Sequence, residues 1–291
     1  MKKGKTNTSD VCASNIIKFD AWWHIMEKYR LEGETFVIDD YDKLPAFSSF
    51  LPGLAGVKGI PMWTFYTNRG QGMNSFGIDN KGNAIMEFNS ANTAFENTTV
   101  KGFRTFLIID GEYYEPFFKY EADAKRQIRM NKNSFKVIEK NEKYGIEVTI
   151  NYYVLPNESI GALVRQVSIK NISGKDKNIE VIDGLPKIIT YGISNGEFKE
   201  MSNLFKSWAY IKNIDNKVPY YTLRASTKDS AEVSDVEGGY YYLTVRDGKL
   251  QDVIYDVDTV FGYDLSLMTP ARFIDGGVDN VLAKKQCFAN K

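Results

Sequence analysis

The stretch GALVRQVSIKN, residues 161–171, indicates most directly how this chain folds. Its side chains alternate between two sets, Leu163, Arg165, Val167 and Ile169 in one and Val164, Gln166, Ser168 and Lys170 in the other. Successive side chains of a strand point to opposite faces, so the alternation predicts a strand with one buried face and one mostly wet face. Such half-buried strands are typical of antiparallel sheets.

Similar short runs, rich in Val, Ile, Tyr and Phe, follow one another from about residue 60 onward. The clearest cover residues 84–88, 103–109, 135–140, 144–155, 178–185, 220–226 and 240–246. Between them lie Gly-containing segments of hairpin type, such as DNKGN, NISGKDKN and VRDGKL. Many short strands joined by such turns predict a mostly β protein, built as a sandwich or a barrel.

Two segments depart from strand alternation. IIKFDAWWHIMEKYRLEG, residues 16–33, has the apolar spacing of one amphipathic helix ended by Gly33, although its aromatic part also fits an edge segment. Residues 197–213 form the longest part of the second half without alternation, and we expect them to be helical or irregular. Long connections in a sandwich are more often functional than short ones.

The bulk properties exclude several classes of function. Lys and Arg together number 37, as do Asp and Glu, so the chain of 291 residues has no formal net charge and is not expected to bind nucleic acid or an anionic membrane. Cys12 and Cys287 lie near opposite ends and predict free thiols, not a disulfide framework or a metal site. No apolar run has the length of a signal peptide or a membrane span, so we expect a cytoplasmic protein without metal or other cofactor.

Few residues are candidates for catalysis. His24 is the only histidine, which excludes paired-histidine chemistry and the HExxH zinc motif. Acidic residues cluster at 39–42, 121–123 and 252–258, where solvated turns are the more common interpretation. We therefore predict no catalytic residue in this chain.

The stretch MWTFYTNRGQGMNSFG, residues 62–77, combines aromatic rings with amide and guanidinium groups. The pattern favours a strand followed by a Gly-rich hairpin, with Trp63 and Tyr66 on opposite faces of the strand. A hairpin tip requires neither Arg69 nor Gln71, however. Aromatic faces beside amide and guanidinium groups are also what a pyranose ring needs, since it offers an apolar C–H face and many hydroxyls. Trp63, Tyr66, Asn68, Arg69 and Gln71 are therefore candidate sugar-binding residues.

The same stretch begins a succession of motifs that resembles a known family. WTFYTNRGQGMNSFGIDNKGNAIMEF, YRLEGETFVIDDYDKLPAFSSFLPG, VTINYYVLPNESIGALVRQVSIKN and DVDTVFG resemble segments of the N-terminal domain of inverting glycoside phosphorylases of the cellobiose and cellodextrin phosphorylase type. The larger relatives that act on β-1,3-glucan or similar oligoglucosides look closest. The resemblance covers about residue 29 to the end, and the order of the motifs is more specific than any one of them.

The resemblance implies an antiparallel β supersandwich of the galactose-mutarotase type, with one or two short helices, over residues 29–275. It implies an N-terminal extension at 1–28 and, at 276–291, the start of a linker to a helical domain that holds the catalytic acid and the phosphate site. Such enzymes split β-linked gluco-oligosaccharides with inorganic phosphate as co-substrate, release α-glucose phosphate with inversion, and are homodimers. The chain by itself is then expected to be inactive.

In the cellobiose-type relatives, a segment containing Asn-Phe-Gln-Arg reaches toward the acceptor sugar. The matching region here keeps Asn203 but has Phe205 in place of glutamine and Lys206 in place of arginine. A lysine point charge does not reproduce a planar bidentate guanidinium, so we expect a longer or differently linked glucan, stacked on Phe205 or Trp208.

Two other functions stay open at this point. One is an independent carbohydrate-binding module, for which Trp63, Tyr66, Arg69 and Trp208 would form the platform. The other is a mutarotase-like sugar epimerase, which a single histidine makes the weakest of the three.

Overall fold

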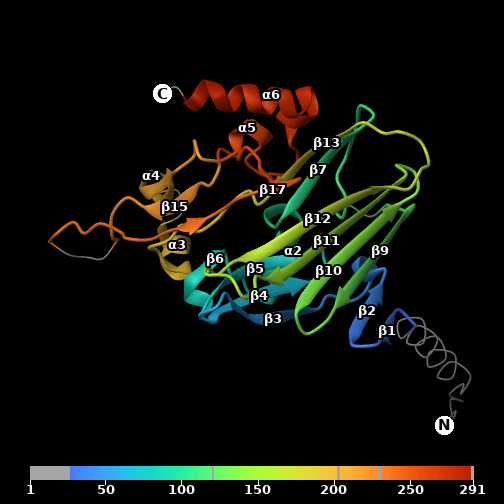
Figure 1. Cartoon of the computed structure of the whole chain (residues 1–291), viewed down its shortest axis with the longest axis horizontal. Helices are drawn as coiled ribbons and strands as arrows, with labels where there is room; N and C mark the ends of the chain where they lie inside the picture. Colours follow the sequence, from blue (N-terminus) through green and yellow to red (C-terminus); the bar gives the residue numbers. More distant parts are fainter. Residues whose placement is uncertain (1–26, 120, 202–203, 228–230, 290–291) are drawn as a thin grey trace, which may run out of the picture.

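The computed structural model of the chain describes residues 27–289, except for positions 120, 202–203 and 228–230 (Figure 1). For Pro52, Lys206 and residues 284–289 it describes the backbone alone. The predicted mostly β, antiparallel architecture is confirmed, because every strand pair within the sheets of the described part is antiparallel.

Sheet A, the largest, contains in spatial order β1 (Tyr29–Glu32), β2 (Thr35–Asp39), β9 (Ala124–Met130), β10 (Ser134–Asn141), β11 (Ile146–Val154) and β12 (Leu163–Asn171). Sheet B contains β3 (Ser48–Ala55), β4 (Ile60–Thr67), β5 (Met73–Ile78) and β6 (Ala84–Met86). Sheet C contains β13 (Ile179–Gly184), β7 (Arg104–Ile109) and β8 (Glu112–Tyr114). Sheet D contains β14 (Ala209–Lys212), β15 (Tyr220–Leu223) and β16 (Tyr240–Tyr241), and a small hairpin pairs β17 (Val245–Arg246) with β18 (Lys249–Leu250).

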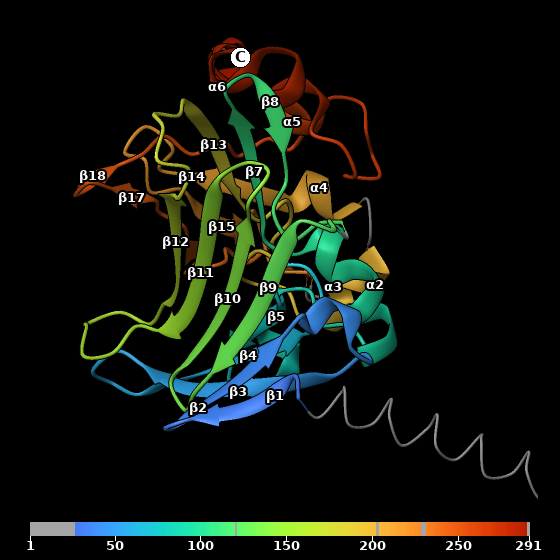
Figure 2. The same cartoon turned by 90° about the vertical axis from the view of Figure 1, so that its right-hand side faces the viewer.

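The helices lie at the sides and one end of these sheets (Figures 1 and 2). They are α2 (Ala91–Lys101), α3 (Asn195–Met201), α4 (Phe205–Trp208), α5 (Asp258–Phe261) and α6 (Ala271–Ala289), with 3₁₀ turns η1 (Tyr41–Lys43) and η2 (Lys81–Asn83). In both views, α5 and α6 lie beyond sheet C, at the end of the molecule opposite β3.

The main core lies where the inner face of sheet A meets sheets B and C. Its buried members include Val137 and Ile150 from sheet A, Met73 from sheet B and Leu107 from sheet C. Each such side chain contributes about 1.5–3 kcal/mol when it leaves water. The alternation predicted for residues 161–171 is therefore confirmed, since Arg165 and Val167 face inward beside Tyr152 and Ile150.

The central strand of sheet C, β7, is buried on both faces. On the outer side of the sheet, Phe106 and Ile182 pack against Val260 of α5 and Phe273 of α6. Helix α6 breaks at Gly276–Gly277, where Gly277 has a φ of +62° and the next amide, of Val278, donates to Glu180 of β13 at 2.9 Å. The linker was expected to start at position 276, which coincides with this break.

The helix predicted over residues 16–33 is wrong in its last part. Tyr29–Glu32 form strand β1 and Gly33 lies in the turn to β2, while residues 16–26 lie outside the described part of the chain. Leu31 pairs with Phe36, and the rings of Tyr29 and Phe36 stack at 6.1 Å. Cross-strand pairing with β2 outweighs the local helical periodicity.

The segment at 197–213 is helical in part, as expected, with α3 and α4 followed by strand β14. In the residues that were described, no helix combines the length and the apolar character needed to cross a membrane.

Candidate functional site

The hairpin predicted at residues 62–77 is confirmed, with β4 and β5 joined by a tight turn at 68–72. The amide of Thr67 donates to the Gly72 carbonyl at 2.8 Å, and the amide of Gly72 donates to the Arg69 carbonyl at 2.9 Å. Gly72 has a φ of +82°, and a Cβ there would lie 2.2 Å from the ring of Phe135. The turn therefore requires glycine at this position for both conformation and space.

Two polar residues of the turn hold it to the preceding loop. The Asn68 side chain is fully buried, donates to the Tyr41 and Pro45 carbonyls at 2.9 Å each, and accepts from the Phe47 amide at 2.9 Å. Arg69 is half-buried and donates to the Leu44 carbonyl of that loop at 3.2 Å and to the Asn68 carbonyl at 2.7 Å. The Asn68 amide group is thus satisfied within the protein, as buried polar groups require.

Gln71 belongs to what we call the arginine network, which consists of Gln71, Thr105, Tyr152, Arg165 and Asp183. Arg165 donates to the Gln71 side chain at 2.6 Å, to Asp183 at 2.6 Å and to the Tyr152 hydroxyl at 2.7 Å. Gln71 also donates to the Thr105 hydroxyl at 3.0 Å. Tyr152 and Arg165 belong to sheet A, Thr105 and Asp183 to sheet C, and Gln71 to the turn that joins two strands of sheet B. The network therefore connects all three sheets.

Tyr66 points to the core side of β4. Its ring stacks on Phe135 at 4.4 Å, and burial raises the pKa of its hydroxyl. Tyr66 and Trp63 lie on opposite faces of the strand, as predicted.

Trp63 contributes to a second group, the aromatic face, which consists of Phe50, Trp63, Phe65 and Phe88. Ring centroids lie 4.8 Å apart for Phe50 and Phe65 and 5.7 Å apart for Trp63 and Phe88. Phe50 is 50% exposed, and the buried indole N–H of Trp63 has no acceptor among the described residues. Unlike the arginine network, this face leaves apolar surface and one polar donor unpartnered.

Helices α3 and α4 pack beside the aromatic face. Lys199 of α3 donates to the Phe88 carbonyl at 2.5 Å, and the Asn195 side chain accepts from the Phe88 amide at 3.0 Å. Phe205 is buried edge-to-face against Phe198 at 4.9 Å, in the hydrophobic cluster that also contains Trp63 and Trp208.

The structure thus divides the predicted sugar-binding residues. It brings Trp63, Phe205 and Trp208 into one hydrophobic cluster, in which Phe205 is buried and does not offer its ring for stacking. It places Tyr66, Asn68 and Gln71 inside the protein. Asn203 lies outside the described residues, and the side chain of Lys206 is not described. The neighbours Phe50 and Phe88 were missed by the sequence analysis, although FNSAN at 88–92 and FSSF at 47–50 place an aromatic ring beside small polar residues.

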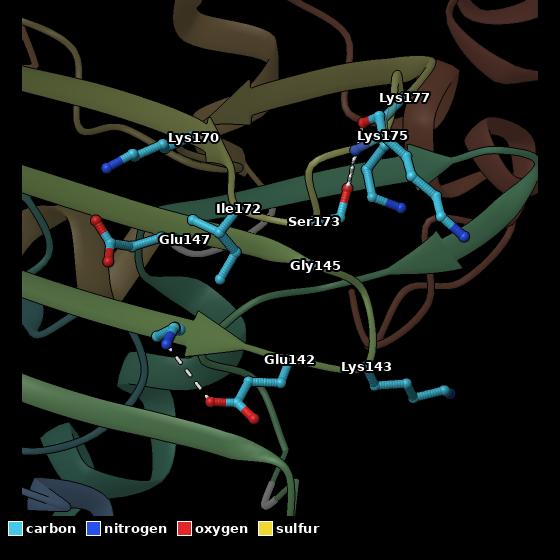
Figure 3. Close-up of a pocket in the computed structure, with 10 residues that line it drawn as sticks. Glu142, Lys143, Gly145, Glu147, Lys170, Ile172, Ser173, Lys175 and Lys177 are labelled. Carbon is cyan, nitrogen blue, oxygen red and sulfur yellow. Dashed lines mark hydrogen bonds and ion pairs between the residues drawn. The ribbon is translucent and has the colours of Figure 1, made fainter.

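A separate concavity of about 690 Å³ lies at the ends of β10, β11 and β12 (Figure 3). It is lined by lysines and two glutamates, namely Lys140, Lys143, Lys170, Lys175, Lys177, Glu142 and Glu147. Lys140 pairs with Glu142 at 3.4 Å, Lys177 with Asp110 at 3.2 Å, and Glu147 lies opposite Lys170 in the strand register. Such alternating charges are typical of a solvated sheet edge, and we assign this concavity no chemistry.

Within the described residues, no group of three or more His, Cys, Asp or Glu side chains could hold a metal ion. His24 and Cys12 lie outside those residues, and the side chain of Cys287 is not described.

Comparison with known proteins gives no family assignment. No protein-family model matches the sequence, and no curated protein matches it.

Proposed function

We propose that this chain is the N-terminal, non-catalytic domain of a cytoplasmic, homodimeric glycoside phosphorylase, with the β supersandwich of the galactose-mutarotase type at residues 29–275. In this proposal, the full-length enzyme splits β-linked gluco-oligosaccharides with phosphate, and this domain shapes the acceptor subsites and the subunit interface. The observation that supports it most is the position of α3 and α4. Phe205, from the segment that resembles the acceptor-contacting segment of phosphorylases, and the nearby Trp208 lie in one hydrophobic cluster with Trp63 of sheet B.

The aromatic face suits one side of a glucan chain. The apolar C–H face of a β-linked glucose packs well on the apolar faces of aromatic rings. Trp63 and Trp208 are half-buried and Phe50 is half-exposed, so part of each side chain reaches solvent. We propose Trp63 and Trp208 as stacking residues, with Asn203, which precedes α4 in the sequence, and Lys206 of α4 as polar contacts.

The buried candidates have a positioning role in this proposal. Tyr66, Asn68 and Gln71 fix the hairpin whose strand displays Trp63, and Phe205 fixes α4 against α3. Arg69, which is half-buried, is the turn residue that we propose as a contact to the sugar cleft or to a neighbouring subunit.

The chemical step is assigned to the helical domain. Inverting phosphorolysis needs one general acid, and phosphate itself is the nucleophile. Burial raises the pKa of Glu115, as a general acid would require, but its carboxylate is held by Arg104 at 2.6 and 2.8 Å. Glu115 is thus engaged in a buried ion pair, and we propose no catalytic role for it.

The test is calorimetric titration of the chain with β-1,3-gluco-oligosaccharides, with α-1,4-linked oligosaccharides as the control ligand. We expect binding of the β-linked ligand, weakened about tenfold by Trp63→Ala and unchanged by Phe36→Ala, a matched half-exposed aromatic on β2. Incubation with the same ligand and phosphate should yield no glucose phosphate. Turnover by this chain alone, or an affinity that Trp63→Ala leaves unchanged, would contradict the proposal.

A stand-alone carbohydrate-binding module is the second candidate, because the half-exposed Phe50 already gives the aromatic face an accessible ring. Fusion or addition of the helical domain distinguishes the two functions. A module binds oligosaccharide equally well alone, whereas an acceptor-shaping domain gains affinity when the helical domain completes the cleft. Any change in the rate of optical-rotation decay of fresh glucose would instead favour the mutarotase-like epimerase.

A further inference from the structure

Residues 263–268, which we call the exposed loop, connect α5 to α6 and display large apolar side chains to solvent. Tyr263 is 95% exposed and Leu265 is 86% exposed, and Met268 is also exposed. Single exposed apolar residues are normal on protein surfaces, whereas a contiguous group marks a contact site. Three such side chains occur within six residues of this loop.

The loop is held in one conformation by its own polar residues. The Asp264 carboxylate accepts hydrogen bonds from the Ser266 amide at 2.9 Å, from the Ser266 hydroxyl and from the Thr269 amide at 2.8 Å. The Ser266 hydroxyl is the main reason that the pKa of Asp264 is lowered. Asp264 is therefore ionised at neutral pH, and its position fixes the backbone on both sides of Leu265.

A buried ion pair between Arg104 and Glu115 anchors the backbone of the loop to sheet C. The Arg104 guanidinium of β7 donates to the Leu267 carbonyl and, at 3.0 Å, to the Met268 carbonyl. The same group forms the bidentate pair with Glu115, and the ring of Phe106 lies 4.7 Å from it. The loop backbone is thus tied to the central strand of sheet C, and its apolar side chains are presented without a loss of loop entropy on binding.

The sequence around the loop is acidic apart from Arg272, whose guanidinium lies 5.9 Å from the centre of the Tyr263 ring. Residues 256–279 contain five aspartates and one arginine, a net charge of −4 in a chain whose total formal charge is zero. Asp258, Asp275 and Asp279 are exposed. Asp256 and Asp264 accept hydrogen bonds from backbone amides and a hydroxyl, which leave their negative charge in place.

We propose that the exposed loop is a preformed docking site for a protein partner whose surface has an apolar socket surrounded by basic side chains. Tyr263 and Leu265 enter the socket, and the aspartates of residues 256–279 pair with the basic rim. Apolar residues at the centre of a patch and charged residues at its edge are the usual arrangement of protein interfaces. This inference stands on the loop itself and does not depend on the proposed function.

The charge also argues against a second copy of the chain as the occupant. In a two-fold dimer the same patch lies on both sides, so two acidic segments would face each other. Sedimentation velocity should show no self-association that depends on Leu265. A dimer that Leu265→Asp dissociates would overturn the proposal in favour of a second copy.

The main test is selection of binders from a displayed library of randomised peptides with the wild-type chain. We expect the selected peptides to combine aromatic or aliphatic residues with Lys and Arg, and to bind more weakly as salt is raised. Leu265→Asp should reduce their affinity at least about tenfold, whereas Leu54→Asp, a matched exposed leucine on β3, should not. Both positions are exposed, and unchanged melting temperatures confirm that the variants fold.

Three results would overturn the proposal. The first is a selection in which basic residues are not enriched. The second is an equal loss of peptide affinity for Leu265→Asp and Leu54→Asp. The third is a selection that yields no binder to the wild-type chain.

Discussion

The arginine network and the aromatic face both include residues of the β4–β5 hairpin. They differ in whether their polar groups have hydrogen-bond partners and in whether their rings are shielded from solvent. Around Arg165, the donors of Gln71 and the carboxylate of Asp183 find partners within the protein. At the aromatic face, the Trp63 indole N–H has no acceptor among the described residues and Phe50 is half-exposed. In the proposed function, the buried residues of the turn serve stability, and the strand that carries Trp63 offers surface to a ligand. Mutations should separate the two roles.

The largest effect is expected from Arg165→Met in the arginine network. It leaves Asp183 partly buried without its cation, and loss of one partner of a buried ion pair costs about 3–5 kcal/mol of unfolding free energy. Urea unfolding measures the change. The double variant with Asp183→Leu should recover a large part of the loss, because the uncompensated charge is then gone. A loss below about 1 kcal/mol in the single variant would show that the network does not hold the sheets together.

A smaller loss of unfolding free energy is expected from Gly72→Ala in the turn of the hairpin. The added methyl meets the Phe135 ring in a left-handed backbone conformation, so the free energy of unfolding should fall by about 2–3 kcal/mol. Gly33→Ala is the matched control, because Gly33 has a φ of +61° and open space around it. That control should show only the conformational cost of about 1 kcal/mol. Equal losses in thermal unfolding would mean that contact with Phe135 does not constrain the turn.

The sequence predicted local features well and long-range partners poorly. The alternation at 161–171 and the hairpin at 62–77 are properties of neighbouring residues, and both are confirmed. Gln71 and Arg165 lie 94 positions apart in the sequence, and their contact follows from the way the sheets meet. No local pattern contains that information.

The dependence on long-range packing also explains two elements in which the structure differs from the sequence prediction. Strand β1 has helical periodicity but pairs with β2, which lies only a turn away. Helix α2, at Ala91–Lys101, was not predicted, and its weakly apolar sequence is held by tertiary contacts such as the Thr67 to Thr98 hydroxyl hydrogen bond at 3.1 Å. Tertiary packing decides such elements.

At the aromatic face, Phe50→Ala should affect ligand binding more than stability, whereas the network variants should affect stability. Half of the ring is already in water, so the stability loss should stay below about 1.5 kcal/mol. Loss of one stacking contact of about 1 kcal/mol should weaken oligosaccharide binding five- to tenfold, as measured by calorimetry. Binding unchanged by Phe50→Ala and by Trp63→Ala together would remove the aromatic face as a sugar site.

The smallest effect concerns the helix beside the aromatic face. Ser194 and Glu197 form a capping box at the start of α3, with the Ser194 amide donating to Glu197 at 2.8 Å and the Glu197 amide donating to the Ser194 hydroxyl at 3.2 Å. Hydrogen bonds from the Ser194 hydroxyl and the Ser194 amide to the carboxylate lower the pKa of Glu197 below its ordinary value of 4.5. The stabilisation is therefore present above pH 4.5 and is lost as the pH falls through the lowered value.

Ser194→Ala should cost about 0.5–1 kcal/mol at neutral pH. The loss should shrink in acid, where protonated Glu197 no longer favours the capping geometry. Thermal unfolding of both proteins across this pH range measures the difference. A cost that is independent of pH would exclude the Glu197 carboxylate as part of the cap.

The most direct test of the central claim uses nitrogen-labelled protein and a titration with β-1,3-gluco-oligosaccharide, followed by NMR. The account predicts that the indole N–H signals of Trp63 and Trp208 shift with ligand, while the side-chain signals of Gln71 and Arg165 stay in place. Shifts at Gln71 and Arg165 without a change at Trp63 would contradict it, because the ligand would then reach the arginine network and not the aromatic face.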